Sequence, residues 1–446
     1  MGDVHPSPPN RTARLLLGLP LTGIPDRPLA ARALLATHVA RKALRELHQR
    51  PSEITDTARN ALAGAILMEI TCRHFGSASM LRGRHGLFPH IFMPRFDGPH
   101  FDEALRRFAL PGQGPNVLYF SLTGACPCTC DYCYAGASAG EVQDIGDQAV
   151  LEVARQVARL RVPVVNISGG EPLTRYSRLK KAVRVLSAGS EVRMFTTGLG
   201  LDDRRLAELE EAGLTGIFVS LDGADAAAFD RVRGFEGAFE AATSALRRSA
   251  RAGMLTYVNC VVGRQRFRNR ARIADFLRFV EGIHPGVAVN FIPQLATGRG
   301  VQVDSFSRPE ECHEVAERIV ETGRELGRPV ALLFGTIDTF LGCAGAGGKL
   351  LNVDIAGNVT VCISKAALGN LLDEPFEDIY ARYVESCDRL KVGFFCADVA
   401  QRTGERILVS EDSHEELAGF YARSPDSTWQ KTLDRYGGLF ATIVPA

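Results

Sequence analysis

Short apolar segments alternate with longer amphipathic segments from residue 116 onward, and this alternation limits the possible folds more than any other feature. An apolar run of about four to eight residues is typical of a buried strand, whereas helical spacing of apolar residues over a longer stretch is typical of a crossover helix. The longer stretches include Asp147–Arg161 and Gly237–Ala252. The pattern therefore predicts a parallel sheet with helices between its strands. The predicted strands are Val117–Leu122, Val164–Ser168, Val192–Thr196, Gly216–Leu221, Leu255–Val261 and Val287–Ile292.

Changes in this pattern divide the chain into three predicted domains. Residues 1–113 show helical spacing at 27–50 and 53–75, followed by an irregular connector, and are expected to form a helical N-terminal extension. Residues 114–305 contain the alternating core. Residues 306–446 begin with a predicted linker helix and continue into a cysteine-bearing region with glycine-rich turns.

The composition argues against several classes of protein. A chain of 446 residues that is 46% hydrophobic can bury a sizeable core. The formal net charge of +1 gives no overall attraction to nucleic acid or to an anionic membrane. No apolar stretch reaches the ~20 residues of a bilayer span, and no secretion signal is visible. The odd number of cysteines, eleven, favours metal ligation over a disulfide framework, so a soluble cytoplasmic protein is expected.

Four cysteines are crowded into residues 126–133. Three of them follow the spacing Cys126-x3-Cys130-x2-Cys133 and offer three thiolates without an obvious fourth ligand. A closed structural metal site completes four coordination positions, whereas a reactive site leaves one open. A zinc knuckle and a chance cluster of buried thiols are the alternatives. Cys128 is expected not to be a ligand, because coordination from between two neighbouring ligands is awkward.

A second motif, Ser168-Gly169-Gly170-Glu171-Pro172, follows the second predicted strand. Its two glycines would let the backbone approach a ligand closely, and its carboxylate could accept a hydrogen bond from an ammonium group. An ordinary strand-to-helix turn is the alternative. The motif lies one strand–helix unit after the cysteines, and this conjunction favours a binding site.

The three-cysteine run, with the aromatic Tyr134 after it and an apolar strand before it, resembles the cluster loop of the radical S-adenosylmethionine (SAM) enzymes. The resemblance implies an α/β fold with a partial (βα)6 TIM-like barrel whose reactive residues lie at the C-terminal ends of the strands. It also implies that Cys126, Cys130 and Cys133 hold a [4Fe-4S] cluster whose fourth iron is chelated by SAM. One electron would pass to the SAM sulfonium, giving methionine and a 5′-deoxyadenosyl radical that abstracts hydrogen from a C–H bond.

The same resemblance implies residues that contact SAM. Tyr132 is expected at the adenine, with core packing as the alternative, and the Gly-Gly-Glu motif is expected at the amino group. Ser220 and Asp222 are expected at the ribose hydroxyls, with a turn as the alternative, and Arg233 at the carboxylate. The complete set of expected cofactor-binding residues is Tyr132, Gly169, Gly170, Glu171, Thr196, Ser220, Asp222 and Arg233.

The C-terminal cysteines resemble those of the SPASM/twitch domains appended to many radical SAM enzymes. Two predicted strands, Leu350–Ile355 and Val359–Cys362, are joined there by a glycine-containing turn. The resemblance implies a small α+β domain with an auxiliary [4Fe-4S] cluster. The dense Cys-x2-Cys-x5-Cys run of full SPASM domains is absent, so one auxiliary cluster is expected. Its expected ligands are Cys343, Cys362, Cys387 and Cys396, with a buried apolar cysteine as the alternative for the last two.

The substrate expected from the resemblance is a sugar-like small metabolite of the aminoglycoside or aminocyclitol type, dehydrated or dehydrogenated in antibiotic biosynthesis. Size and layout are similar to those of the radical SAM diol dehydratases of apramycin-type pathways. A maturase for a ribosomally made precursor peptide is the alternative, and a non-catalytic iron–sulfur or zinc-stabilised binding module is an alternative of another class. Flavodoxin or ferredoxin is the expected electron donor, and a homodimer is an open alternative. No histidine has a spacing that indicates a general base, so no catalytic residue is assigned.

Overall fold

The computed structural model describes residues 81–332 and 350–387, apart from gaps within these ranges. The gaps are 89–90, 92, 97, 110–113, 141–143, 264–266, 268, 295–297, 303–308, 329 and 362–366. The helices predicted at 27–50 and 53–75 therefore lie outside the described residues, as do Cys343, Cys362 and Cys396.

A curved parallel sheet forms the centre of the molecule, and its six core strands confirm the predicted α/β fold of a partial TIM-like barrel. Each strand hydrogen-bonds in parallel to the next strand of the chain, and each begins and ends within two residues of its predicted bounds. These strands are β3 (Val117–Thr123), β4 (Val164–Gly169), β5 (Glu191–Thr196), β6 (Leu214–Ser220), β7 (Leu255–Val262) and β8 (Ala288–Pro293).

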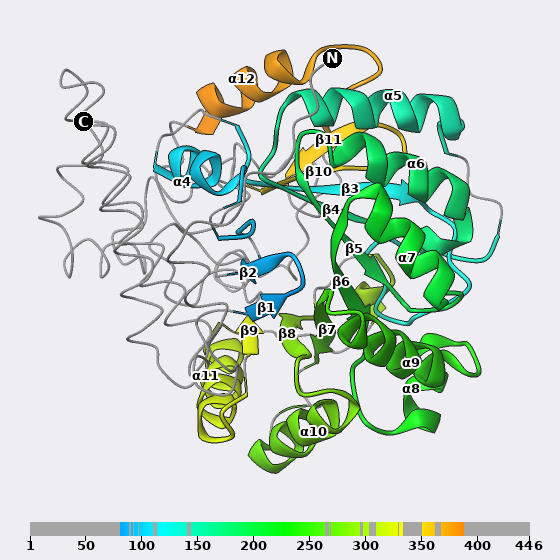
Figure 1. Ribbon diagram of the computed structural model, residues 1–446, viewed down its shortest axis with the longest axis vertical. Coiled ribbons are helices and arrows are strands. Elements are labelled where there is room, and N and C mark those ends of the chain that lie inside the picture. Colours follow the sequence, from blue (N-terminus) through cyan, green and yellow to red (C-terminus); the bar gives the residue numbers. More distant parts are fainter. Residues whose placement is uncertain are drawn as a thin grey trace, which may run out of the picture.

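Crossover helices connect these strands and lie along the outer side of the sheet (Figure 1). Three of them begin at a side-chain cap: Asp202, Asp225 and Asn269 each accept a backbone N–H in the first turn of a helix. Two helices end at a left-handed glycine, Gly213 and Gly234. The helices are α5 (Gly146–Arg159), α6 (Tyr176–Leu186), α7 (Asp203–Ala212), α8 (Ala226–Arg233), α9 (Ala238–Arg251) and α10 (Arg270–Ile283).

Further strands extend the sheet at both edges. The predicted linker helix at Pro309–Leu326 is α11 (Pro309–Glu325), and it leads to β9 (Val330–Leu332), which pairs in parallel with β8. At the other edge, a strand from far along the chain pairs in parallel with β3. The two strands predicted for the C-terminal region thus belong to the barrel sheet. The strands and helix at this edge are β10 (Leu350–Val353), β11 (Asn358–Val361), β12 (Ala367–Asn370) and α12 (Phe376–Cys387).

The segment before β3 differs from its prediction. An irregular connector was predicted, but the structure contains a hairpin of β1 (Leu81–Gly83) and β2 (Gly86–Phe88), followed by helix α4 (Phe101–Ala109). The two strands are three residues each, which is too short for a period-two pattern to be visible in the sequence. The hairpin packs against the inner faces of β6 and β7 and fills the barrel interior there.

Strand β5 shows how the two faces of the sheet are packed. Val192 and Met194 point into the core between the sheet and its helices. Arg193 and Phe195 point the other way because side chains alternate along a strand. The Phe195 ring stacks on Phe218, with ring centroids 4.5 Å apart. The hairpin and this stack fill the inside of the barrel beside β5, β6 and β7.

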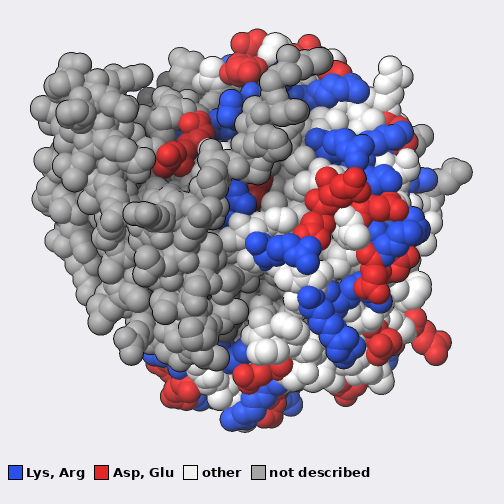
Figure 2. All heavy atoms as spheres, viewed as in Figure 1, with Lys and Arg blue, Asp and Glu red and all other residues white. Residues whose placement is uncertain are grey.

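The face shown in Figure 2 carries Lys and Arg side chains interspersed with Asp and Glu over the outer helices. This mixture agrees with the near-neutral net charge of +1. Within the described part of the chain, the helices are all too short or too polar to cross a bilayer.

Candidate cofactor-binding site

The cysteine loop, residues 124–140, follows β3 at the C-terminal edge of the sheet. Cys126, Cys128 and Cys130 are buried, Cys133 is half-buried, and all four are free thiols. They pack together with Ala137 in one small cluster. The structure therefore brings together the three cysteines that the spacing selected, and it places Cys128 among them.

Hydrogen bonding within the loop separates the cysteines by their affinity for protons. Cys128 hydrogen-bonds to the cysteines on both sides of it and stabilises their thiolates. These hydrogen bonds lower the pKa of Cys126 and lower the pKa of Cys130 to about 6. The nearby Arg233 also lowers the pKa of Cys130. The same bonds, together with burial, raise the pKa of Cys128. Cys126 and Cys130 are thus favoured as thiolates and Cys128 as a thiol, and iron binds thiolates.

Among the described side chains, no group of three His, Cys, Asp or Glu residues is placed as for a single metal ion. An iron–sulfur cluster holds its thiolates on separate iron atoms and so spreads them more widely. The thiols of this loop are the donors that such a cluster takes.

The two glycines of the second motif contact the cysteine loop. Gly170 N–H donates to the Thr123 carbonyl at 2.6 Å, and a Cβ at Gly170 would lie 2.2 Å from the Ala125 carbonyl oxygen. Gly169 has φ +109°, a conformation that favours glycine. The sequence interpretation was that these glycines allow a close approach to a ligand. In the structure they allow β4 to approach the start of the cysteine loop.

Glu171 is buried and accepts four hydrogen bonds from its own chain. Leu173 N donates to it at 3.0 Å, Thr196 Oγ1 at 2.8 Å, and Thr197 through N at 2.6 Å and Oγ1 at 2.7 Å. Burial raises the pKa of Glu171, and the donors from Thr197 oppose that shift. Two expected site residues, Glu171 and Thr196, are thus in contact and tie the end of β4 to the end of β5. Contact between Glu171 and the SAM amino group stays a prediction.

Three other expected SAM contacts bond to one another. Asp222 accepts from Arg233 Nη2 at 2.6 Å, from the Tyr132 hydroxyl, and from Val261 N at 2.7 Å. Arg233 Nη1 lies 3.5 Å from Cys130 Sγ, a contact that the sequence gave no sign of. In the structure these side chains join the cysteine loop to the ends of β6 and β7, and their contacts with SAM stay predictions.

A second arginine, Arg299, also hydrogen-bonds to the cysteine loop. It lies in a 3-10 turn, η4 (Gly298–Gln302), after β8. Its Nε donates to the Cys130 carbonyl at 2.6 Å, and its Nη1 donates to the Ala137 carbonyl at 2.8 Å. Nothing in the sequence indicated this contact, because no local pattern reveals where a long side chain donates.

A row of polar side chains crosses the inner face beside the loop. Ser220, Asn259 and Asn290 are in register on β6, β7 and β8, and Asn290 Nδ2 donates to Asn259 Oδ1 at 2.8 Å. Among the described residues, the buried oxygens of Asn166 and Asn290 and the amide nitrogen of Gln294 have no hydrogen-bond partner. Buried polar groups are normally paired, so these atoms fit a bound polar molecule such as SAM.

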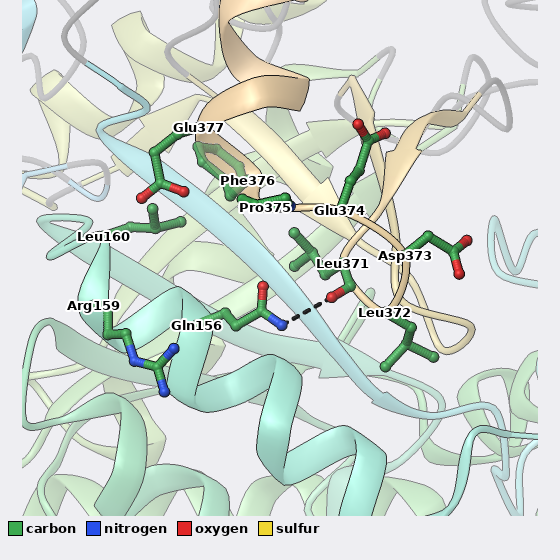
Figure 3. A pocket seen from close by; sticks show the side chains of 10 residues that line it. All are labelled: Gln156, Arg159, Leu160, Leu371, Leu372, Asp373, Glu374, Pro375, Phe376 and Glu377. Atoms are coloured by element: carbon green, nitrogen blue, oxygen red, sulfur yellow. Dashed lines mark hydrogen bonds between the residues drawn. The ribbon is translucent and has the colours of Figure 1, made fainter.

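A separate hollow of about 360 Å³ lies between α5 and the turn at 371–377. In Figure 3, Gln156 and Arg159 of α5 face that turn, and Gln156 donates to the Leu371 carbonyl at 2.8 Å. No residue of the cysteine loop lines this hollow. Cys387, an expected auxiliary ligand, is the last residue of α12, and its side chain is not among those described. The auxiliary ligand set therefore stays a prediction.

Known sequences match the barrel region. Residues 120–277 match the family described as the Radical SAM superfamily. A PqqA peptide cyclase of Methylocella silvestris is 31% identical over 34% of this chain and 40% of its own length. An AdoMet-dependent heme synthase of Methanosarcina barkeri is 29% identical over 47% of this chain and 59% of its own length. The mycofactocin maturase MftC of Mycolicibacterium smegmatis is 26% identical over 60% of this chain and 70% of its own length. The chain thus spans less than two thirds of the first two relatives.

A solved structure shares the fold. The structure of Streptococcus suis SuiB bound to S-adenosylmethionine matches with a TM-score of 0.51 at 13% identity, covering 60% of this chain and 66% of SuiB. The family match coincides with the parallel strands that carry the cysteine loop and the Gly-Gly-Glu motif. Residues 120–277 thus match the radical SAM superfamily, and this match implies a [4Fe-4S] cluster and SAM as cofactors.

Proposed function

We propose that this protein is a radical SAM enzyme in which Cys126, Cys130 and Cys133 hold the SAM-chelating [4Fe-4S] cluster. The observation that carries the proposal is the gathering of these three thiols in one loop, at the C-terminal edge of the sheet, within the region that matches that superfamily. When bound, the cluster and SAM supply one-electron reduction of the sulfonium, which releases methionine and a radical able to abstract hydrogen from a C–H bond.

The chain's own residues orient the cofactors and keep water from them. The glycines of β4 set the cysteine loop against the strand end, and Glu171 fixes β4 to β5. SAM would lie beside the loop over β4 to β8, where the unpartnered side-chain oxygens of Asn166 and Asn290 and the unpartnered amide nitrogen of Gln294 offer polar contacts. The proposal also includes the SAM contacts expected from the sequence, domain boundaries at 113 and 305, and an auxiliary cluster held by the C-terminal cysteines.

The substrate class favoured by the relatives is a peptide, because PqqA peptide cyclase is named for a peptide substrate and shares 31% identity with this chain. A sugar-like small metabolite is the second candidate. It is favoured by the reduced set of C-terminal cysteines, which lacks the dense run of full SPASM domains. Flavodoxin or ferredoxin would supply the electron in either case.

Replacing Cys126, Cys130 and Cys133 together by Ala tests the central proposal. Formation of 5′-deoxyadenosine from SAM under anaerobic reducing conditions is expected to fall to the background rate, because no cluster remains to reduce the sulfonium. Cys128→Ala is the matched control in the same loop and is expected to retain 5′-deoxyadenosine formation. If the triple variant still makes 5′-deoxyadenosine, the proposed ligand set is wrong.

Co-expression tests the substrate class. A short reading frame adjacent to the gene is expressed with and without the enzyme, and the peptide mass is measured. Loss of about two hydrogens, ~2 Da, is expected for oxidative cross-linking of a peptide by radical chemistry. If the mass of the co-expressed peptide does not change, or if aminosugar genes lie beside the gene instead of a short reading frame, the sugar-like metabolite is favoured.

A further inference from the structure

The three thiols of the cysteine loop do not have equal surroundings. Cys130 Sγ lies 3.5 Å from Arg233 Nη1, within hydrogen-bonding distance for sulfur. Among the described residues, no cationic side chain donates to the sulfur of Cys126 or of Cys133. One ligand therefore has a positive charge beside it that the other two lack.

Arg233 is held firmly in this place. Its side chain is 7% exposed, and its Nη2 pairs with Asp222 at 2.6 Å. The guanidinium lies over the rings of Tyr132 and Phe229, at 5.5 Å and 4.9 Å from their centroids. Its backbone carbonyl accepts from Thr129 N at 2.9 Å, so the residue that ends α8 is also tied to the cysteine loop. Movement of Arg233 away from Cys130 would leave a buried carboxylate without its partner, which is costly.

A donor at a ligand sulfur changes how easily a cluster is reduced. Reduction adds one negative charge to the cluster and its thiolates, and a hydrogen bond or a cation at a sulfur stabilises that charge. Asp222 lies on the other side of the same guanidinium and acts in the opposite direction. Both effects grow as water is excluded, and both side chains are buried.

We propose that Arg233 is a positioning residue that raises the reduction potential of the SAM-chelating cluster through the sulfur of Cys130, with Asp222 fixing its place and offsetting part of its charge. The proposal rests on the proposed function, because it needs a cluster on this loop. The step concerned is the gain of one electron from an external reductant. No bond to Arg233 forms or breaks, and its guanidinium keeps its proton.

The test is an anaerobic potentiometric titration of the reconstituted, SAM-free protein, followed by electron paramagnetic resonance and with dithionite as reductant. Arg233→Met is expected to lower the midpoint potential, so that the ratio of reduced to oxidised cluster at a fixed potential falls about tenfold, equivalent to 59 mV for one electron. Asp222→Asn is expected to raise the midpoint. Simple loosening of the loop would not produce shifts of opposite sign.

Arg299→Lys is the matched control, because it disturbs a donor to the Cys130 carbonyl while keeping the positive charge. Its midpoint is expected to stay at the wild-type value, and an equal shift there would overturn the proposal. Where Arg233→Met does not fold, Arg233→Lys serves in its place. One ammonium cannot donate to Asp222 and Cys130 in the geometry of a guanidinium fork, so a smaller negative shift is expected.

The outcomes separate this inference from the proposed function. An unchanged midpoint in Arg233→Met protein that carries a cluster overturns the inference alone, and weakened SAM binding in that variant would then assign Arg233 to the SAM carboxylate. Equal iron content in the wild type and in the variant with Cys126, Cys130 and Cys133 replaced by Ala would overturn the proposed function as well.

Discussion

The two ends of the barrel each bury an arginine beside a carboxylate, but the arginines serve different partners. Toward the N-terminal end, Arg193 is fully buried and pairs with Glu191 at 2.7 Å. Toward the C-terminal end, Arg233 pairs with Asp222 at 2.6 Å. Arg193 also donates to backbone carbonyls of the segment after the hairpin, at Ile91 and Met93. Arg233 instead donates to the sulfur of Cys130.

This difference separates a role in stability from a role in chemistry. Carbonyl oxygens have no redox or proton chemistry, so the N-terminal pair can only hold the segment at 91–93 in the barrel. A thiolate sulfur can bind iron, so the C-terminal pair can affect reactivity. Barrels of this class carry their reactive groups at the C-terminal ends of the strands, and the two arginines follow that division.

Arg193→Met gives the largest expected effect on stability. It removes the arginine from the buried Glu191 carboxylate and from two backbone carbonyls, so the free energy of unfolding is expected to fall by about 3–5 kcal/mol, measured by urea denaturation. Arg84→Ala, in the turn of the hairpin, is the control, because Arg84 is exposed and its ion pair with Glu210 is worth less than about 1 kcal/mol. The comparison fails if Arg193→Met protein is as stable as the wild type.

Gly170→Ala is expected to disturb the C-terminal end next most strongly. Its new Cβ would lie 2.2 Å from the Ala125 carbonyl oxygen, so the cysteine loop must move away. We expect a loss of about 3 kcal/mol in stability and a marked fall in iron bound per chain after reconstitution. Gly223→Ala, shortly after the end of β6, has open space for a Cβ and is expected to change neither quantity. Full iron loading of Gly170→Ala protein would contradict the close packing between β4 and the loop.

Asp144→Asn is expected to cause the smallest loss of stability of these variants, and the size of that loss depends on pH. The hydrogen bond from Arg178, 2.6 Å from Asp144, lowers the pKa of this carboxyl from its usual 3.8. A lowered carboxyl pKa contributes stability that is present above 3.8 and is lost as pH falls through the folded-state pKa. The variant is expected to lose about 2 kcal/mol at neutral pH, because a hydrogen bond between charged groups is removed.

Denaturation curves at pH 7 and at acid pH measure this difference. The stabilities of the wild type and the Asp144→Asn variant are expected to converge as pH falls below the usual carboxyl pKa of 3.8. A difference that stays constant with pH would show that the carboxyl is not stabilised in its charged form.

The repeating part of the fold could be predicted from the sequence. Strands β3 to β8 carry apolar side chains on both faces, and a buried parallel strand reads as a continuous apolar run. The cysteine spacing and the Gly-Gly-Glu motif were equally visible because they are contiguous. The structure brings them together, since consecutive parallel strands end at one edge of the sheet.

Long-range pairings and side-chain destinations could not be predicted. Strand β10 pairs with β3 across more than half of the chain, and the three-residue strands of the hairpin show no periodicity. Likewise, Arg233 and Asp222 could be recognised from the sequence only as polar residues near a strand end, and we expected them to contact SAM. Their mutual ion pair depends on the three-dimensional path of α8, which brings Arg233 back toward the strand end.

The hold of Arg299 on the cysteine loop has a consequence for the timing of biosynthesis. Arg299 lies 169 residues after Cys130, whose carbonyl it binds. A ribosome that adds about 5–20 residues per second needs roughly 8–34 s to make that stretch. During that interval the cysteines lack one of the side chains that shape their loop. Iron would therefore enter efficiently only after β8 is made, and a ribosome-bound chain arrested before residue 298 is expected to take up less iron than one arrested beyond β9.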